Sequence, residues 1–443
     1  MAFSLRTAAT LPLSAALAAG AASPALAGGF KLSEYSVLDL GMAGSGYAAL
    51  AEGPETIWAN PAGLTALDGL QIQAGAHGVI GRGEFNDAGS LNALGAPLAG
   101  AEEDDLFNDA LVPNLYLSGA LNDTVTVGLG VNAPFGLATE YRPDSLTRFQ
   151  AVKSRLQVLD FNPSIGVAVN DELSVGFGLS AQYADASLSN AIDFRAVCLS
   201  RASPAQCAAS GLAPGPAEGF SRVAGDDWSF GWNAGVLWEP EPGTRLGLSH
   251  RSEISHELEG AVEYGKPAGA ALFAPVFNDV SASAPLDLPA ETALSLRHQA
   301  TDRLALNASL VWTWWDLDAL VVDYDNPAQP QTRDRLGYDN AARVSIGAEY
   351  DWRPDWTLRA GLAFDESPTP DDERTPRAPD SDRVIASIGA SWSPNETVQV
   401  DAGWQHLFFD DAEVDRTGAG GDRLVGHFDN AADIVGVSVT WRR

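Results

Sequence analysis

The chain has 443 residues, of which 45% are hydrophobic, and a formal net charge of −31. This charge argues against a nucleic-acid partner, because proteins that bind nucleic acids present basic patches. The mean hydropathy of −0.06 suits a soluble protein or a membrane β-barrel, whose strands alternate lipid-facing and lumen-facing residues. The acidic residues cluster in predicted loops, where they form a solvated surface or bridge to lipid phosphates through divalent cations.

The N-terminus has the pattern of a secretory signal peptide over residues 1–27. Arg6 supplies the positive charge, a short apolar run follows, and Ala25-Leu26-Ala27 fits an A-x-A cleavage site. The apolar run is interrupted by Pro12 and is too short for a spanning helix, which needs about 20 apolar residues. We therefore expect export, with the mature chain starting at Gly28.

The next segment, residues 28–68, is rich in small residues and does not alternate as a strand does. It contains Trp58-Ala59-Asn60-Pro61-Ala62, in which Asn can bond nearby backbone amides and Pro fixes a dihedral. Because strand patterns fill the rest of the chain, we interpret residues 28–68 as a plug. Residues 69–443 are then the barrel that surrounds it.

The clearest strand is Trp228–Trp238, in which one face is apolar and aromatic and the other is small and mostly polar. Trp228 and Trp238 are ten residues apart. At about 3.3 Å per residue and a tilt near 40°, their separation projects to roughly 25 Å, the spacing of the two aromatic girdles of an outer-membrane barrel. The last strand repeats the pattern and ends on Trp441.

The pattern predicts an all-β transmembrane fold, a 14-stranded antiparallel barrel. The expected strands are 70–82, 111–121, 124–134, 152–169, 172–188, 227–240, 243–258, 288–299, 303–316, 340–352, 355–365, 382–393, 396–409 and 431–442. Tight turns alternate with long loops at 83–110, 135–151, 189–226, 259–287, 317–339, 366–381 and 410–430. Short periplasmic turns and long external loops favour a barrel over a soluble sandwich, which has no reason to gather its long loops at one end.

Two of these loops carry further candidates. Cys198 and Cys207 lie close together in one loop and suggest a disulfide in an exported protein, or else two free thiols. The loop 189–226, which carries both cysteines, could form an external hydrophobic groove with the loop 259–287, or the two loops could simply pack on each other. The groove candidates are Leu272, Phe273, Val276 and Phe277.

The third strand meets Pro134-Phe135-Gly136. Pro cannot donate to the β-ladder and Gly tolerates unusual dihedrals, so strand pairing can break there. From the residues alone, Pro134 could equally end the strand at a loop.

The chain resembles the outer-membrane long-chain fatty-acid and hydrocarbon transporter family (FadL-like proteins) over its whole mature length. The matching segments are GGFKLSEYS and WANPAGL near the start, APFGLATEY (Ala133–Tyr141), FGWNAGVLWE (Phe230–Glu239), LDLPAE (Leu286–Glu291) and AGLAFDESPTP (Ala360–Pro370). The resemblance implies a barrel plugged by an N-terminal hatch. It also implies passive uptake of hydrophobic molecules, captured by the external loops and released laterally beside the kinked third strand.

On this resemblance, Asn60-Pro61-Ala62 is the hatch motif, Phe30 is a candidate gate or ligand contact near a free N-terminus, and Pro134–Gly136 is the lateral exit. Long-chain fatty acid or another hydrophobic molecule is the expected partner, in contact with outer-membrane lipid and lipopolysaccharide. We expect a monomer that needs no cofactor or metal.

Fatty-acid transporters are expected to place basic residues in the lumen for the carboxylate. Around Tyr183–Asn190 and Thr313–Val322 there is no Arg or Lys, and aspartates such as Asp185 occur instead. A neighbouring carboxylate would repel the ligand in a lumen of low dielectric constant. Either another cation serves, or the substrate is a less charged hydrocarbon, alcohol or ester. The candidate cations are Arg155, Arg297 and Arg343.

Three other functions compete with uptake. A general porin would have charges of both signs at a constriction and no plug. An outer-membrane hydrolase would need a catalytic set, but the six histidines are scattered and G-x-S-x-G is absent, so we expect no enzyme. A structural or adhesive barrel is the third alternative.

Overall fold

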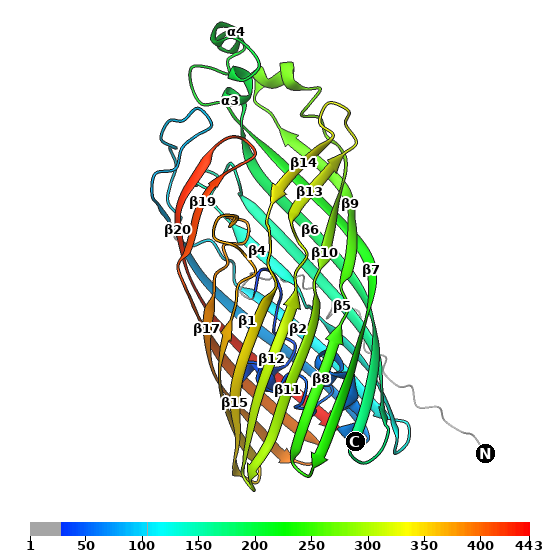
Figure 1. Ribbon diagram of the computed structural model, residues 1–443. Coiled ribbons are helices and arrows are strands. Elements are labelled where there is room, and N and C mark those ends of the chain that lie inside the picture. Colours follow the sequence, from blue (N-terminus) through cyan, green and yellow to red (C-terminus); the bar gives the residue numbers. More distant parts are fainter. Residues whose placement is uncertain (1–27, 104) are drawn as a thin grey trace, which may run out of the picture.

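The computed structural model describes residues 28–103 and 105–443 (Figure 1). The predicted signal peptide, residues 1–27, lies outside the described residues. The fold is a closed antiparallel barrel of fourteen strands, as the sequence predicts, and β1 pairs with β20 to close it. No helix in the described ranges is long and apolar enough to cross a membrane.

Several barrel strands are interrupted, so the structure contains more strand segments than barrel positions: β3 with β4, β8 with β9, β10 with β11, β12 with β13, β14 with β15 and β18 with β19 share positions. The segments are β1 Leu70–Asp87, β2 Ala110–Ala120, β3 Val125–Asn132, β4 Gly136–Glu140, β5 Lys153–Ala168, β6 Leu173–Asp193, β7 Glu218–Glu241, β8 Thr244–Arg251, β9 Ile254–Gly265, β10 Val280–Leu288, β11 Ala290–Thr301, β12 Leu304–Trp314, β13 Ala319–Tyr324, β14 Gln331–Arg335, β15 Ala341–Arg353, β16 Trp356–Asp365, β17 Arg383–Asn395, β18 Val398–Phe409, β19 Ala412–Thr417 and β20 Arg423–Arg442. The helices are α1 Val37–Leu40, α2 Thr56–Ala59, η2 Pro61–Ala66, α3 Phe194–Leu199, α4 Pro204–Ala209 and η3 Ala268–Phe273.

The tight turns form where an asparagine side-chain oxygen accepts hydrogen bonds from backbone amides in place of a backbone carbonyl. The Asn122 side-chain oxygen accepts from the amides of Thr124 and Val125 at 2.9 and 3.0 Å. Asn170 and Asn395 make the same pair of contacts in their own turns. Such Asx turns reverse the chain within two to four residues, so neighbouring strands pair directly.

The side chains alternate between the two faces of the wall, as the two-residue period predicts. On β7, Trp228, Phe230, Trp232 and Trp238 face outward, and 74% of Phe230 is exposed. The outward row of β20 ends on Trp441. In a membrane this exposed apolar surface faces lipid, and the aromatic residues suit its interfaces.

The predicted loops at 189–226 and 259–287 are shorter in the structure than expected. β6 continues to Asp193, β7 starts at Glu218, and β9 and β10 extend to Gly265 and from Val280. The predicted loops 317–339 and 410–430 likewise contain the β13–β14 hairpin and β19. These extensions project beyond the apolar band, where the outer face of a strand need not be apolar, so the lipid-facing pattern that marks the other strands does not reveal them.

Residues 28–68 lie inside the barrel (Figure 1), and we call them the lumenal segment. Most of its side chains are buried, and its short helices pack on the inner faces of strands around the wall. Close approach depends on wall glycines: a Cβ at Gly176 would lie 2.2 Å from the Ala62 nitrogen, and one at Gly235 would lie 2.0 Å from Asn60 Oδ1. At these two positions the backbone of the wall lies so close to the lumenal segment that only the hydrogen side chain of glycine fits.

Candidate ligand path through the barrel

An apolar space of about 100 Å³, which we call the inner cavity, lies inside the upper half of the barrel. Its walls come from β4, β5, β6, β7, β9, β10 and β13, and representative lining residues are Leu137, Leu156, Leu258 and Leu286. Phe30 of the lumenal segment also lines it. The lining is almost wholly hydrocarbon apart from Arg155, Arg377 and two hydroxyl-bearing residues, with the Tyr338 ring at one side.

A larger space of about 600 Å³, the outer groove, adjoins the inner cavity and is lined in part by residues of α3. Leu188, Val223, Leu320, Val322 and Arg377 line both spaces. The two spaces therefore adjoin across a short apolar neck that carries one cation.

The sequence-predicted groove residues separate in the structure. Phe277 lines the outer groove and is half-buried, but Phe273 is buried in a cluster beneath α3 and α4. Val276 is half-buried beside it and does not line the groove, and the side chain of Leu272 lies outside the described residues. Around Phe273 the two loops pack on each other, because the Phe273 ring fills the space between η3 and the external helices.

Cys198 of α3 and Cys207 of α4 form a disulfide, with Cα atoms 5.9 Å apart. Both cysteines are buried with Phe194, Leu212 and Phe273 in the same cluster. The disulfide and this cluster hold the two short helices together above the groove. Helices of six residues need such support, since isolated helices of that length are unstable in water.

The three arginines proposed from the sequence already have protein partners. Arg155 lines the inner cavity but pairs with Asp185 at 2.6 Å. Arg297 is held by two carboxylates, those of Glu52 and Glu349, at 2.9 and 3.2 Å. Arg343 lies lower in the lumen, where its guanidinium donates to the Ala43 carbonyl at 3.2 Å.

Arg377, which sequence reasoning missed, lies at the neck between the groove and the cavity. Its hydrogen bonds in the described part of the chain go to neutral oxygens of Ser154, Ser189 and Asn190, at 3.4 to 3.5 Å. Its Nε has no partner there. Burial lowers the pKa of Arg377 from its ordinary value, because desolvation penalises the charged form.

Strand pairing is interrupted between Asn132 and Gly136, which includes the candidate exit residues. β2 and β3 pair up to Leu115 and Val131, β3 ends at Asn132, and β4 resumes on β5 at Gly136. Above this point, β2 is next linked to the β4 side by a single bridge between Phe107 and Thr139, just before β2 begins. Pro134 lacks an amide proton, so it cannot donate to the ladder within this gap.

The N-terminus covers the break from inside. The Leu32 amide donates to the Pro134 carbonyl at 2.8 Å, and the Gly136 amide donates to the Phe30 carbonyl at 2.9 Å. The Phe30 ring packs against Phe135 and against Trp315, with ring centroids 6.2 and 5.0 Å away. Phe30 therefore closes the floor of the inner cavity at the level where the wall opens.

Asn60-Pro61-Ala62 lies elsewhere and anchors the lumenal segment. Asn60 Oδ1 caps η2 by accepting from the Ala62 amide, and its Nδ2 donates to the carbonyls of Ala48 and Val236 at 2.7 and 3.0 Å. Pro61 occupies the first position of η2, where a missing N–H is tolerated. The motif thus ties the segment to β7, whereas Phe30 belongs to a different cluster of side chains.

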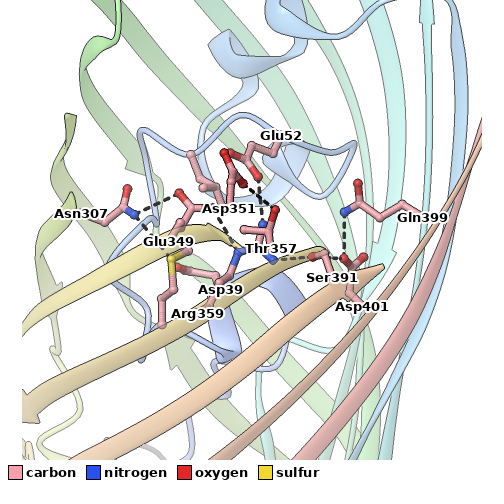
Figure 2. Close-up of polar contacts among 12 residues, drawn as sticks. Asp39, Glu52, Asn307, Glu349, Asp351, Thr357, Arg359, Ser391, Gln399 and Asp401 are labelled. Carbon is pink, nitrogen blue, oxygen red and sulfur yellow. Dashed lines mark hydrogen bonds and ion pairs between the residues drawn. The ribbon is translucent and has the colours of Figure 1, made fainter. Parts of the chain in front are cut away.

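A buried ion network fixes the other side of the segment (Figure 2). Glu52 pairs with Arg297 of β11 and Arg359 of β16, and Glu349 of β15 pairs with the same two arginines at 3.2 and 3.1 Å. Asn307 donates to Glu349 at 3.1 Å. The two carboxylates and two guanidiniums compensate each other's charge, so the network joins the segment to three strands by paired rather than isolated charges.

A wall with lipid-facing aromatic residues, a filled lumen and an apolar space that ends at a break in the wall define an outer-membrane transport barrel. The model of the outer membrane protein transport protein family (OMPP1/FadL/TodX) matches residues 18–442, and the chain belongs to that family. The protein is accordingly an outer-membrane protein.

Relatives and solved structures agree with this assignment. A long-chain fatty acid transport protein of Escherichia coli O6:H1 is 29% identical, with 86% of each chain covered. A 47 kDa outer membrane protein of Pasteurella multocida is 31% identical, with 88% of this chain and 89% of the relative covered. The crystal structure of a Pseudomonas aeruginosa FadL homologue has the same fold, with a TM-score of 0.84 at 24% identity, covering 94% of this chain and 99% of that chain. The P. putida toluene transporter TodX gives a TM-score of 0.70 at 18% identity, covering 91% of this chain and 97% of that chain.

Proposed function

We propose that the protein takes hydrophobic molecules from the cell surface into the outer membrane, with long-chain fatty acids as the main cargo. The outer groove receives the molecule, the inner cavity holds it, and it leaves sideways through the wall break once the N-terminus withdraws. The observation that carries the proposal is that the outer groove adjoins the apolar inner cavity, which reaches the break, where Phe30 closes the path.

The physical gain on each step is the removal of hydrocarbon from water. Each buried CH₂ contributes about 0.8 kcal/mol. A chain in the inner cavity is thus bound without an energy source, and it passes to the bilayer without a penalty because lipid is equally apolar. We assign no catalytic residue to this path.

Arg377 favours an acid over a hydrocarbon as the main cargo. Its hydrogen bonds are long and go to neutral oxygens, so a ligand carboxylate at the neck gives it a better partner. The second candidate cargo, an uncharged hydrocarbon, is supported by the predominantly apolar lining of the rest of the cavity. The name of the TodX structure also points to that class of cargo.

The gate is tested by locking the N-terminus to the break. Lys31 and Phe135 face each other as a non-hydrogen-bonded antiparallel pair, whose Cα atoms lie about 4.5 Å apart in such ladders. This spacing suits a disulfide, which needs roughly 4.4 to 6.8 Å. The oxidised double variant Lys31→Cys/Phe135→Cys should bind dodecanoate but fail to deliver it to cells.

Reduction of the same variant should restore uptake, and the wild type with and without reductant controls for the native disulfide. Uptake that continues in the locked protein would exclude this exit. Planar bilayers test the porin alternative, because a barrel filled by the lumenal segment should conduct few ions.

A further inference from the structure

A second polar cluster lies deeper in the lumen, just below the wall break. Asn132, Asp160 and Gln182 are neighbours in register across β3, β5 and β6. All three side chains point inward and are at most 2% exposed. Residues directly opposite in antiparallel strands have Cβ atoms about 5 Å apart, so their side chains meet. We call these three residues the polar shelf.

The shelf has more hydrogen-bonding capacity than the protein uses. Gln182 Nε2 donates to Asp160 Oδ2 at 2.8 Å. Four other buried atoms have no partner in the described part of the chain: Asn132 Nδ2, Asn132 Oδ1, Asp160 Oδ1 and Gln182 Oε1. Leaving one buried polar atom unsatisfied is unfavourable by about 1 to 3 kcal/mol, so four in one place indicate a guest.

The neighbouring residues place this cluster on the ligand path. Asn132 is the last residue of β3 before the break. On β5, the Val158 amide donates to the Phe135 carbonyl inside the break at 3.2 Å, and Leu156 lines the inner cavity. Leu156 and Asp160 lie on the same face, about 13 Å apart at about 3.3 Å per residue. The shelf therefore lies beside the break, one stretch of β5 below the cavity lining.

The free atoms define the chemistry of the guest. Three are acceptors and one is a donor, so the guest must donate at least one hydrogen bond and can accept one. A hydroxyl group fits both requirements. An ionised carboxylate donates none and would face the Asp160 carboxylate. Arg251, one layer below, offsets the Asp160 charge electrostatically, but its guanidinium donates to Ser180 and to the Trp58 carbonyl.

We propose that the polar shelf is a head-group subsite at the wall exit that binds the hydroxyl group of a neutral amphiphile. The proposal rests on the transport function proposed above and specifies its cargo further. A ligand with an anionic head group is favoured at Arg377 near the mouth. A ligand with an uncharged hydroxyl head group is favoured at the shelf, from which it enters lipid.

The test compares decan-1-ol with decane, which share a tail and differ in the hydroxyl group. Binding of each radiolabelled ligand is measured on the purified full-length protein in lipid nanodiscs, after subtraction of empty nanodiscs. Asn132→Leu keeps the side-chain shape and removes two partnerless atoms. It should weaken decan-1-ol binding about five-fold, the effect of one hydrogen bond, and leave decane binding unchanged.

Asn114→Leu is the matched control, because Asn114 lies beside the break on β2 but already donates to the Glu34 carbonyl. It should leave the ratio of the two affinities unchanged. Gln182→Met is a second variant that removes one shelf acceptor together with the Nε2 donor to Asp160, and it should lower the ratio as Asn132→Leu does. An unchanged ratio in both shelf variants, with both ligands still bound, would mean that the shelf holds only water and would overturn the inference. Wild-type protein that binds decane but not decan-1-ol would also overturn the inference, whereas failure of both ligands to bind would instead overturn the proposed function.

Discussion

Removal of the Arg377 charge provides the most direct test of acid recognition. In Arg377→Met a chain of similar length replaces the guanidinium, so the neck stays filled. The hydrogen bonds lost are 3.4 to 3.5 Å long, at the weak end of the range, and we expect the free energy of unfolding to fall by less than about 1 kcal/mol.

The effect on the ligand should be much larger. A hydrogen bond to a charged group contributes about 1.5 to 3 kcal/mol, which corresponds to about a 10- to 150-fold change in affinity. The affinity for dodecanoate should fall by this factor in Arg377→Met, whereas methyl dodecanoate, which has the same tail and no charge, should bind as before. Titration of the purified protein in nanodiscs measures both.

Arg155→Met is the comparison variant, because Arg155 also lines the cavity but is paired with Asp185. Its loss leaves Asp185 without its ion pair and should lower stability, with no selective effect on the acid. If Arg377→Met weakens acid and ester equally, or if only Arg155→Met discriminates between them, the assignment of Arg377 is wrong.

Three further substitutions test how the lumenal segment and external helices are held. Glu52→Gln should leave two buried arginines short of a partner, lower stability by about 1 to 3 kcal/mol and raise ion conductance in planar bilayers; unchanged conductance would contradict a sealing role. Gly235→Ala should lower the midpoint of thermal unfolding, because its Cβ would lie 2.0 Å from Asn60 Oδ1, while Gly215→Ala, with nothing within 4 Å, should not; equal midpoints would refute the close contact. Cys207→Ser should make the segment around α3 and α4 sensitive to protease without unfolding the barrel, since the disulfide closes a short external loop with a sequence separation of 9; a protease-resistant variant would show that packing alone suffices.

The barrel wall was predictable from the sequence because its strands and turns depend on residues that are close together in the chain. Alternating exposure from Trp228 to Trp238 needs only a two-residue period, and the turns at Asn122 and Asn170 need only a short polar side chain. Proline removes a ladder donor wherever it occurs, so the residues indicated an interruption at Pro134 but left open whether it breaks the wall or ends the strand. The strand extensions above the membrane lack the lipid-facing apolar row that would reveal them, although their inner faces carry residues such as Val262 and Val414.

The free or paired state of the lumenal arginines was not predictable from the sequence in this way, because ion pairing between strands depends on the strand register. The sequence places Asp185 as a repulsive neighbour for a ligand, but the structure sets Asp185 opposite Gln157 and beside Arg155, whose charge it balances. Arg377 sits in a loop with no periodicity. The one local signal is its position between Pro376 and Pro379, two residues that stiffen a loop that folds into the barrel mouth.

The polar shelf was likewise not predictable from the sequence alone, and it adds a constraint on the transport mechanism. Asn132 and Gln182 are 50 residues apart in the chain, and only the register of three strands brings them to one level with Asp160. An anion-binding group near the mouth and hydroxyl-binding groups at the exit prefer different protonation states of one carboxylic acid. On these two proposals, a fatty acid that follows this path takes up a proton from water between Arg377 and the break, and its release into lipid becomes favourable because the neutral acid, unlike the anion, is not held back by Arg377.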